Sequence, residues 1–227
     1  MDGIGFKTII FALIGGILPA LLWLWFWLRE DDAKPEPRLL LLLTFLIGMI
    51  AVFLVLPIQK LFNDFNIRED YLTIIWASVE ELVKFGAVWA IALSSKSADE
   101  PIDFAMYMII GALGFAAMEN AFFLIDPIDL GDSTVTLITG NLRFLGAMLL
   151  HAVSSATIGI MLGLSFYRGW FSKKLYLLLG LGGAITLHST FNFLIINNNG
   201  SLLNVFSLLW VVTIIVLLMF EQLRKMT

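Results

Sequence analysis

The chain contains no cysteine, only two histidines, and few charged residues, which make up 14% of its 227 residues. Without cysteine it cannot form disulfides or thiolate metal sites, and it has no cysteine nucleophile. A soluble domain usually carries about 25% charged residues, so the low charge and the 59% hydrophobic content favour a membrane protein. The net charge of −4 and the scattered basic residues exclude nucleic acid as an expected partner.

Long apolar runs separated by short polar breaks fill the rest of the chain. A helix needs about 20 mostly apolar residues to cross the hydrocarbon core of a bilayer. By that rule the sequence predicts an all-α, polytopic membrane helical bundle of about seven transmembrane helices, forming one domain over residues 1–227. The predicted spans are 4–28, 38–60, 71–93, 103–125, 142–167, 174–196 and 201–221. The longest break, 126–141, is predicted to be a loop.

Basic residues near the ends of the spans predict the orientation in the membrane, because the cytoplasmic side carries more of them. The side of the N-terminus has four basic residues: Lys7, Lys60, Arg68 and Arg143. The opposite side has nine: Arg29, Lys34, Arg38, Lys96, Arg168, Lys173, Lys174, Arg224 and Lys225. We therefore expect an N-terminus outside and a C-terminus in the cytoplasm, in a multi-pass protein of the cytoplasmic membrane.

Six ionisable side chains lie inside the predicted spans, although each costs about 2.5–3.5 kcal/mol at the centre of a membrane helix. They are Glu80, Glu81, Lys84, Glu119, His151 and His188, and the last two are the only histidines. With a rise of about 1.5 Å per residue, four of the spans place such groups about 9–14 Å below their predicted outer ends. The sequence therefore predicts one polar cluster in the outer half of the bilayer.

The spacing of these residues favours a site for hydrolysis. Lys84 can reach Glu80 at i,i+4 or Glu81 at i,i+3, and His188 shares a helix face with Asn192. A buried glutamate is a candidate general base for water, and imidazole and amide groups can stabilise an oxyanion. Glutamate and histidine are also zinc ligands. No HExxH motif is present. Two ways of activating water therefore remain: by a bound metal, or by a glutamate without a metal.

Four short motifs carry a family resemblance. They are "EELVK" (80–84), "FAAMEN" (115–120), "HAVSSATIG" beginning at His151, and "HSTFN" (188–192), in this order and each within a predicted span. Together they resemble the PrsW family of intramembrane proteases, which is related to the CAAX prenyl endopeptidases, and the motif-bearing core is about 71–196. The resemblance implies cleavage of a membrane-anchored protein, such as an anti-sigma factor, near the extracytoplasmic side of a prokaryotic membrane.

The resemblance also implies a role for each motif residue. Glu80 becomes the general base for water and Glu81 supports it, while His151 orients or polarises the water. His188 and Asn192 become oxyanion donors, and Lys84 and Asn120 are supporting groups. Glu119 stands where the CAAX enzymes have a histidine, so their mechanism does not transfer directly.

These residues suit a site with or without a metal cofactor, and we slightly favour a metal-independent, glutamate-based site. The candidate ligands for a divalent metal such as zinc are Glu80, Glu119, His151 and His188.

Two other classes of function fit a buried polar cluster. A proton-coupled transporter also needs intramembrane Glu, His and Lys, and a non-catalytic scaffold could bind single-pass helices of other proteins. The predicted loop 126–141 leaves the outer end of the fourth span, beside the expected site. Its length and its Gly and Asp content led us to the hypothesis that it gates substrate entry.

Overall fold

The structure is a computed structural model that describes residues 4–29, 36–197 and 202–226. Lys34, one of the basic residues counted above, and Ser201, the first residue of the last predicted span, lie outside these residues. The described part of the chain is helical and contains no strand. Its α-helices are α1 (Phe6–Leu28), α2 (Arg38–Asn63), α3 (Glu69–Val88), α4 (Pro101–Asp129), α5 (Ser133–Leu142), α6 (Met148–Leu164), α7 (Trp170–Asn197) and α8 (Leu202–Arg224). Two π-helical segments, η1 (Trp89–Leu93) and η2 (Arg143–Ala147), continue α3 and join α5 to α6.

Six described helical segments are long and apolar enough to cross a bilayer. They are Phe6–Leu28, Arg38–Asn63, Pro101–Asp129, Ser133–Leu164, Trp170–Ile196 and Leu203–Arg224. The remaining predicted span corresponds to α3 and η1, which carry Glu80, Glu81 and Lys84 and are therefore less apolar. The prediction of a polytopic helical bundle is confirmed, whereas one domain over 1–227 stays a prediction.

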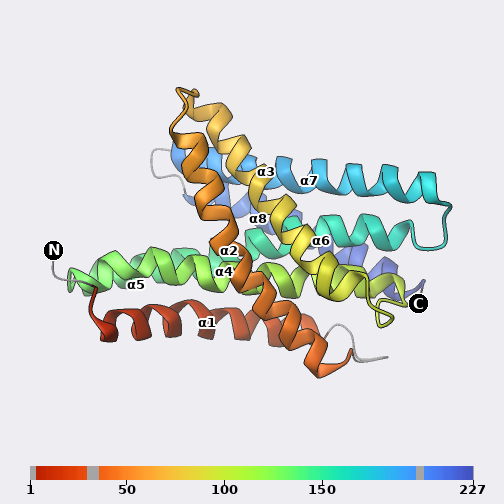
Figure 1. Ribbon diagram of the computed structural model, residues 1–227, viewed down its shortest axis with the longest axis horizontal. Helices are drawn as coiled ribbons and strands as arrows, with labels where there is room; N and C mark the ends of the chain where they lie inside the picture. The colour runs from red at the N-terminus through yellow and green to blue at the C-terminus, as the bar shows by residue number, and fades with distance from the viewer. Residues whose placement is uncertain (1–3, 30–35, 198–201, 227) are drawn as a thin grey trace.

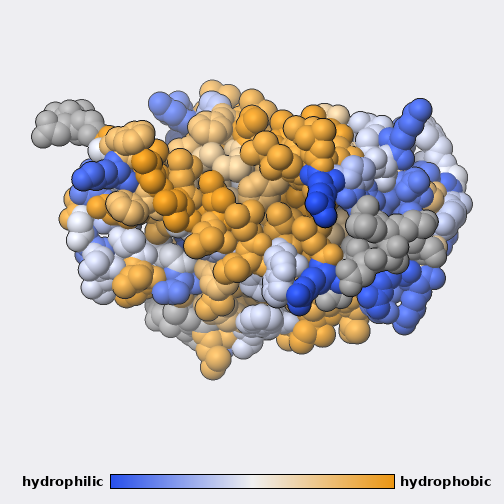
Figure 2. All heavy atoms as spheres, turned by 90° about the horizontal axis from the view of Figure 1, so that it is seen from below, coloured by the Kyte–Doolittle hydropathy of each residue, from blue (hydrophilic) through white to orange (hydrophobic). Residues whose placement is uncertain are grey.

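The helices alternate in direction along the long axis of the molecule, and α2 and α3 cross the others obliquely (Figure 1). The two ends of the chain lie at opposite ends of the bundle. On the face shown in Figure 2, hydrophobic side chains cover the middle, and hydrophilic ones gather toward the ends, most of all at the end of the C-terminus. This distribution suits a bundle that spans a bilayer; the orientation in the membrane stays a prediction.

Helix α4 forms the centre of the bundle and is buried along most of its length. Small residues let its neighbours approach to backbone contact, as is common between helices in lipid. A Cβ added at Gly48 of α2 would overlap the carbonyl of Gly111, and one at Gly114 would overlap the carbonyl of Phe45. On the opposite side, a Cβ at Gly159 of α6 would overlap the backbone of α4. These contacts fix the positions of α2 and α6 beside α4.

The prediction of a long loop at 126–141 is wrong. Helix α4 continues into this segment, and after a short turn with Gly131 at φ 70° the chain enters α5. The side chain of Asp132 accepts a hydrogen bond from the backbone N–H of Val135 and so caps α5. The Ser, Thr and Gly content led to the loop prediction, but this cap and the apolar residues between the threonines support a helix. The gating hypothesis thereby loses the long loop on which it rested.

Candidate active site

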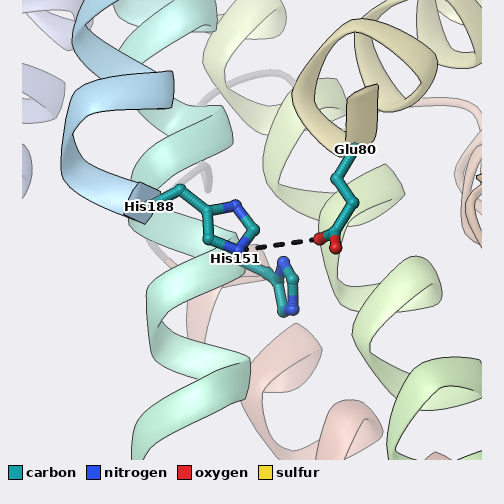
Figure 3. Close-up of side chains that lie close together, drawn as sticks. All are labelled: Glu80, His151 and His188. Atoms are coloured by element: carbon teal, nitrogen blue, oxygen red, sulfur yellow. Dashed lines mark ion pairs between the residues drawn. The ribbon is translucent and has the colours of Figure 1, made fainter. Parts of the chain in front are cut away.

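The structure brings together the six ionisable side chains that the sequence places inside the membrane. Figure 3 shows Glu80 of α3, His151 of α6 and His188 of α7 pointing toward one another. Glu81 and Lys84 are fully buried, and Glu80, His151 and His188 are between 2% and 7% exposed. Glu119 of α4 joins them through His151. Because ionisable groups in a membrane interior need partners, these contacts explain how four helices tolerate them.

Glu80 has one bound and one unbound carboxylate oxygen. Its Oε1 accepts a hydrogen bond of 2.9 Å from Nε2 of Gln59 on α2. Its Oε2 is buried, has no hydrogen-bond partner among the described residues, and lies 3.6 Å from Nε2 of His188. The sequence analysis missed Gln59, although an amide inside the predicted span 38–60 was a signal that could have found it.

Glu81, the next residue, is bound at both oxygens. Its Oε1 accepts from Lys84 Nζ at 2.5 Å and from His188 Nδ1 at 2.7 Å, and its Oε2 accepts from Ser155 Oγ at 3.0 Å. Since a carboxylate can only accept hydrogen bonds, His188 carries its proton on Nδ1 when the ring is neutral. The lone pair of Nε2 then faces Glu80.

Lys84 and Glu119 hold the ring of His151 from two sides. Lys84 Nζ lies 3.0 Å from Nδ1, and Glu119 Oε2 lies 3.1 Å from Nε2. An ammonium group only donates hydrogen bonds, so Nδ1 accepts and Nε2 donates to Glu119. The ring also packs edge to face against His188, with 5.0 Å between the ring centroids. Both nitrogens of His151 are thus engaged in this arrangement.

Arg143 is a second residue that sequence reasoning missed as part of the site. Its Nη2 forms an ion pair with Glu119, its Nε donates to Asn120 Oδ1 at 2.5 Å, and its guanidinium lies 3.7 Å from the centre of the Phe123 ring. The sequence analysis counted Arg143 among the basic residues of the outer side. In the structure its side chain contacts Glu119 and Asn120 of α4, and the outer placement stays a prediction. Its position just inside the predicted start of a span was the available signal.

Asn192 is not part of the hydrogen-bonded network. It lies one helical turn after His188 on α7, as predicted, and is half-buried. Within the described part of the chain its side chain has no hydrogen-bond partner. It therefore has free donor and acceptor groups beside the network.

The donor set fits a divalent metal. Glu80, His151 and His188 each offer one ligand atom, and these atoms lie within 4.8 Å of one another. The unbound Oε2 of Glu80 faces the lone pair of His188 Nε2, and the contact from His188 Nδ1 to Glu81 is the kind that orients a metal-binding histidine. Two histidines and one glutamate form a known ligand set of catalytic zinc.

Two of the predicted metal ligands, His151 and Glu119, are already paired with other side chains in this arrangement. His151 would have to release Lys84 or Glu119 to offer a lone pair. Glu119 falls outside the group, because it is paired with Arg143 and His151.

The fold and the site together define a class: a polytopic membrane protein with a buried glutamate–histidine centre suited to hydrolysis. The family model described as "PrsW family intramembrane metalloprotease" matches residues 36–219. The chain therefore belongs to the PrsW family of intramembrane proteases, and the resemblance found in the sequence is confirmed.

Several known proteins named Protease PrsW are similar to the chain. The protein of Clostridioides difficile is 28% identical over 187 residues, which cover 79% of this chain and 76% of that protein. The protein of Geobacillus kaustophilus is 28% identical over 170 residues, covering 72% and 69%. That of Bacillus subtilis is 25% identical over 189 residues, covering 82% and 83%. No solved structure matches the chain significantly. The chain is accordingly a peptidase. Its apolar helices and its bacterial relatives indicate a multi-pass bacterial membrane protein.

Proposed function

We propose that the protein hydrolyses a peptide bond in a membrane-anchored protein with a water molecule activated at Glu80. The observation that carries the proposal is the Oε2 of Glu80, which is buried, has no partner among the described residues, and faces His188 at 3.6 Å. A general base needs an oxygen that is free to accept a proton. Oε2 of Glu80 meets this condition, whereas both oxygens of Glu81 are bound.

In the proposed reaction, the water oxygen attacks the carbonyl carbon of the scissile bond as its proton moves to Oε2 of Glu80. The protonated Glu80 then gives this proton to the leaving amine when the C–N bond breaks. Glu81 holds the ring of His188 in place, and Lys84 and Glu119 hold that of His151 beside the water. The free amide of Asn192 is suited to donate to the oxyanion.

A metal at this site would be held by Glu80 and His188, with His151 as the third ligand. When bound, zinc supplies a more acidic water and polarises the carbonyl group. The description of the family as metalloproteases favours this route over the metal-independent one that the sequence slightly favoured. Glu81 positions His188 in both routes. With a metal, His151 would give up its contact with Lys84 or Glu119, and Glu80 would serve as a ligand instead of as the base.

The proposed substrate is a single-pass membrane protein, such as an anti-sigma factor, cut near its extracytoplasmic side. Glu80 lies in the first half of the α3–η1 rod, and Glu119 and His188 lie in the second halves of their helices. All three are thus nearer the end of the bundle that the basic residues predict to face outward.

The experiment compares membranes of cells that lack the protein and are complemented with wild type, Glu80→Gln or Glu221→Gln at matched abundance. Glu221 pairs with Arg224 near the end of α8 and serves as the control carboxylate. New protein N-termini near single-pass segments should appear with wild type and with the control, but not with Glu80→Gln. Identical termini from Glu80→Gln would remove Glu80 as the base, and proton flux without cleavage would return the transporter alternative.

The metal is tested separately on the purified protein. Treatment with a chelator should abolish cleavage, and added zinc should restore it, if Glu80 and His188 hold a metal. Full activity in the chelator, together with a metal content far below one ion per chain, would establish the metal-independent route instead.

A further inference from the structure

A cleft of about 210 Å³ lies between the beginning of α3 and the end of α7. Its walls include Leu72 and Trp76 of α3 and Phe193 and Ile196 of α7. The two helices pack against each other, and α3 crosses α7 obliquely (Figure 1). The cleft lies where the first turns of α3 meet the last turns of α7, and the exposed Glu69 and Asp70 border it.

The helical register places this cleft directly beside the active site. Trp76 precedes Glu80 by four residues, and Ile196 follows Asn192 by the same number. Residues spaced by four lie on one face of a helix, about one turn apart. Along the helices α3 and α7, the cleft thus lies about one turn from the Glu80–His188 pair.

Polar groups along the seam between α3 and α7 lack partners in the described part of the chain. The indole Nε1–H of Trp76 is buried without an acceptor, as Oε2 of Glu80 is without a donor. The amide of Asn192 is also free. Burying an unpaired polar group costs about 1–3 kcal/mol, so a ligand that pairs with these groups would bind favourably. An extended peptide offers free backbone N–H and C=O groups, whereas a helix satisfies its own and an acyl chain has none.

A second groove is a poorer match for an extended peptide. It has a volume of about 710 Å³ and lies between α1, α4 and α5, with apolar walls that include Leu18, Leu22 and Leu124. None of the side chains with unpaired buried polar atoms lines it. Its chemistry suits an intact helix or a lipid chain.

We propose that the cleft between α3 and α7 binds an unwound, extended segment of the substrate next to the scissile bond. Trp76 is the residue that positions it, by donating its indole N–H to a backbone carbonyl of the segment. The proposal rests on the proposed function, because it names the peptide-binding part of the same site.

Photocrosslinking tests the position of the segment without requiring cleavage. A photoreactive residue replaces either Leu72 in the cleft or Leu22 in the second groove, in the full chain carrying Glu80→Gln. The probe is a model single-pass protein with a Leu/Ala helix of about 20 residues and a Gly/Ser segment at each end. Adducts should form mainly at position 72 and through a Gly/Ser segment. Adducts mainly at position 22, equal adducts at both, or none at either would overturn the proposal.

Kinetics of Trp76→Phe test the hydrogen bond itself. The variant keeps an aromatic ring but loses the N–H, and Trp89→Phe on the exposed side of η1 is the matched control. On a substrate identified by its new N-termini, Trp76→Phe should raise KM about two- to tenfold, as expected for the loss of one hydrogen bond, with kcat nearly unchanged. An unchanged KM, or an equal rise in the control, would refute the role of Trp76. If wild type cleaves nothing, the proposed function fails, and the crosslinking still decides whether the cleft binds peptide.

Discussion

Glu80 and Glu81 are neighbours in sequence and both are buried, but they face two very different regions. Glu81 belongs to a closed network in which Lys84, His188 and Ser155 donate to it. Glu80 faces the seam between α3 and α7, with one donor and one free oxygen. The comparison indicates that the closed network joins α3, α6 and α7, whereas the oxygen at the open seam, which has no partner among the described residues, is the one at which we propose that water is activated.

Helix geometry explains how adjacent residues reach such different surroundings. Successive side chains on an α-helix point about 100° apart. Glu81 is thereby directed at α6 and at Nδ1 of His188 on α7, while Glu80 is directed at α2 and at the other nitrogen of the same ring. The two acidic residues of one motif therefore have different surroundings, and the proposed roles of Glu80 and Glu81 follow from them.

The largest expected effect on activity comes from Glu80→Gln. Loss of a general base lowers kcat by about 10²–10⁴-fold, while the amide keeps the size of the side chain and an oxygen for Gln59. The thermal unfolding midpoint in detergent should therefore stay close to that of wild type. A variant that retains most of its activity, or that unfolds far more easily, would contradict the assignment of Glu80 to the open seam.

Glu81→Gln should instead act mainly on stability. It removes the charge that pairs with the fully buried Lys84, and breaking a buried ion pair costs about 3–5 kcal/mol. The free energy of unfolding, measured by denaturant titration in micelles, should fall by that order, well beyond the change in Glu80→Gln. Equal stability of the two variants would remove the distinction between the closed network and the open seam.

Arg143→Gln should have an intermediate effect. Arg143 fixes Glu119 and Asn120 but is itself 18% exposed, so its ion pair is partly screened. We expect a loss of about 1 kcal/mol in stability and a moderate decrease in kcat, because Glu119 then holds His151 less firmly. Arg143→Lys keeps the charge but not the second hydrogen bond, so its stability and its kcat should lie between those of wild type and Arg143→Gln. Arg143→Gln with unchanged kcat would show that Glu119 orients His151 without help.

The membrane bundle and most of the site could be predicted from the sequence for a clear physical reason. Ionisable side chains in apolar spans must find partners, so Glu80, Glu119, His151 and His188 were expected to meet once their spans were aligned in depth. The assignment of partners needed the structure. Whether Lys84 binds Glu80 or Glu81 depends on the faces that α6 and α7 present, and spacing along α3 permits both.

Predicted membrane spans alone do not identify every residue of the site. Gln59 and Arg143 lie near the ends of predicted spans, where polar groups usually reach the interface and need no explanation. The structure instead pairs Gln59 with Glu80, and Arg143 with Glu119 and Asn120. The segment of α5 was predicted as a loop because its threonines and glycine are common in loops, while its helix cap depends on local geometry.

The smallest expected effect is that of Ser155→Ala. Ser155 is fully buried and is the only donor to Oε2 of Glu81 among the described residues, so its loss leaves one carboxylate oxygen unpaired. Glu81 keeps Lys84 and His188 at the other oxygen, and we expect a loss of about 1 kcal/mol, clearly less than in Glu81→Gln. The control is Ser78→Ala on the exposed side of α3, where the hydroxyl only bonds the backbone of its own helix. A loss in Ser155→Ala no larger than in Ser78→Ala would mean that Glu81 depends on its contacts with Lys84 and His188 alone.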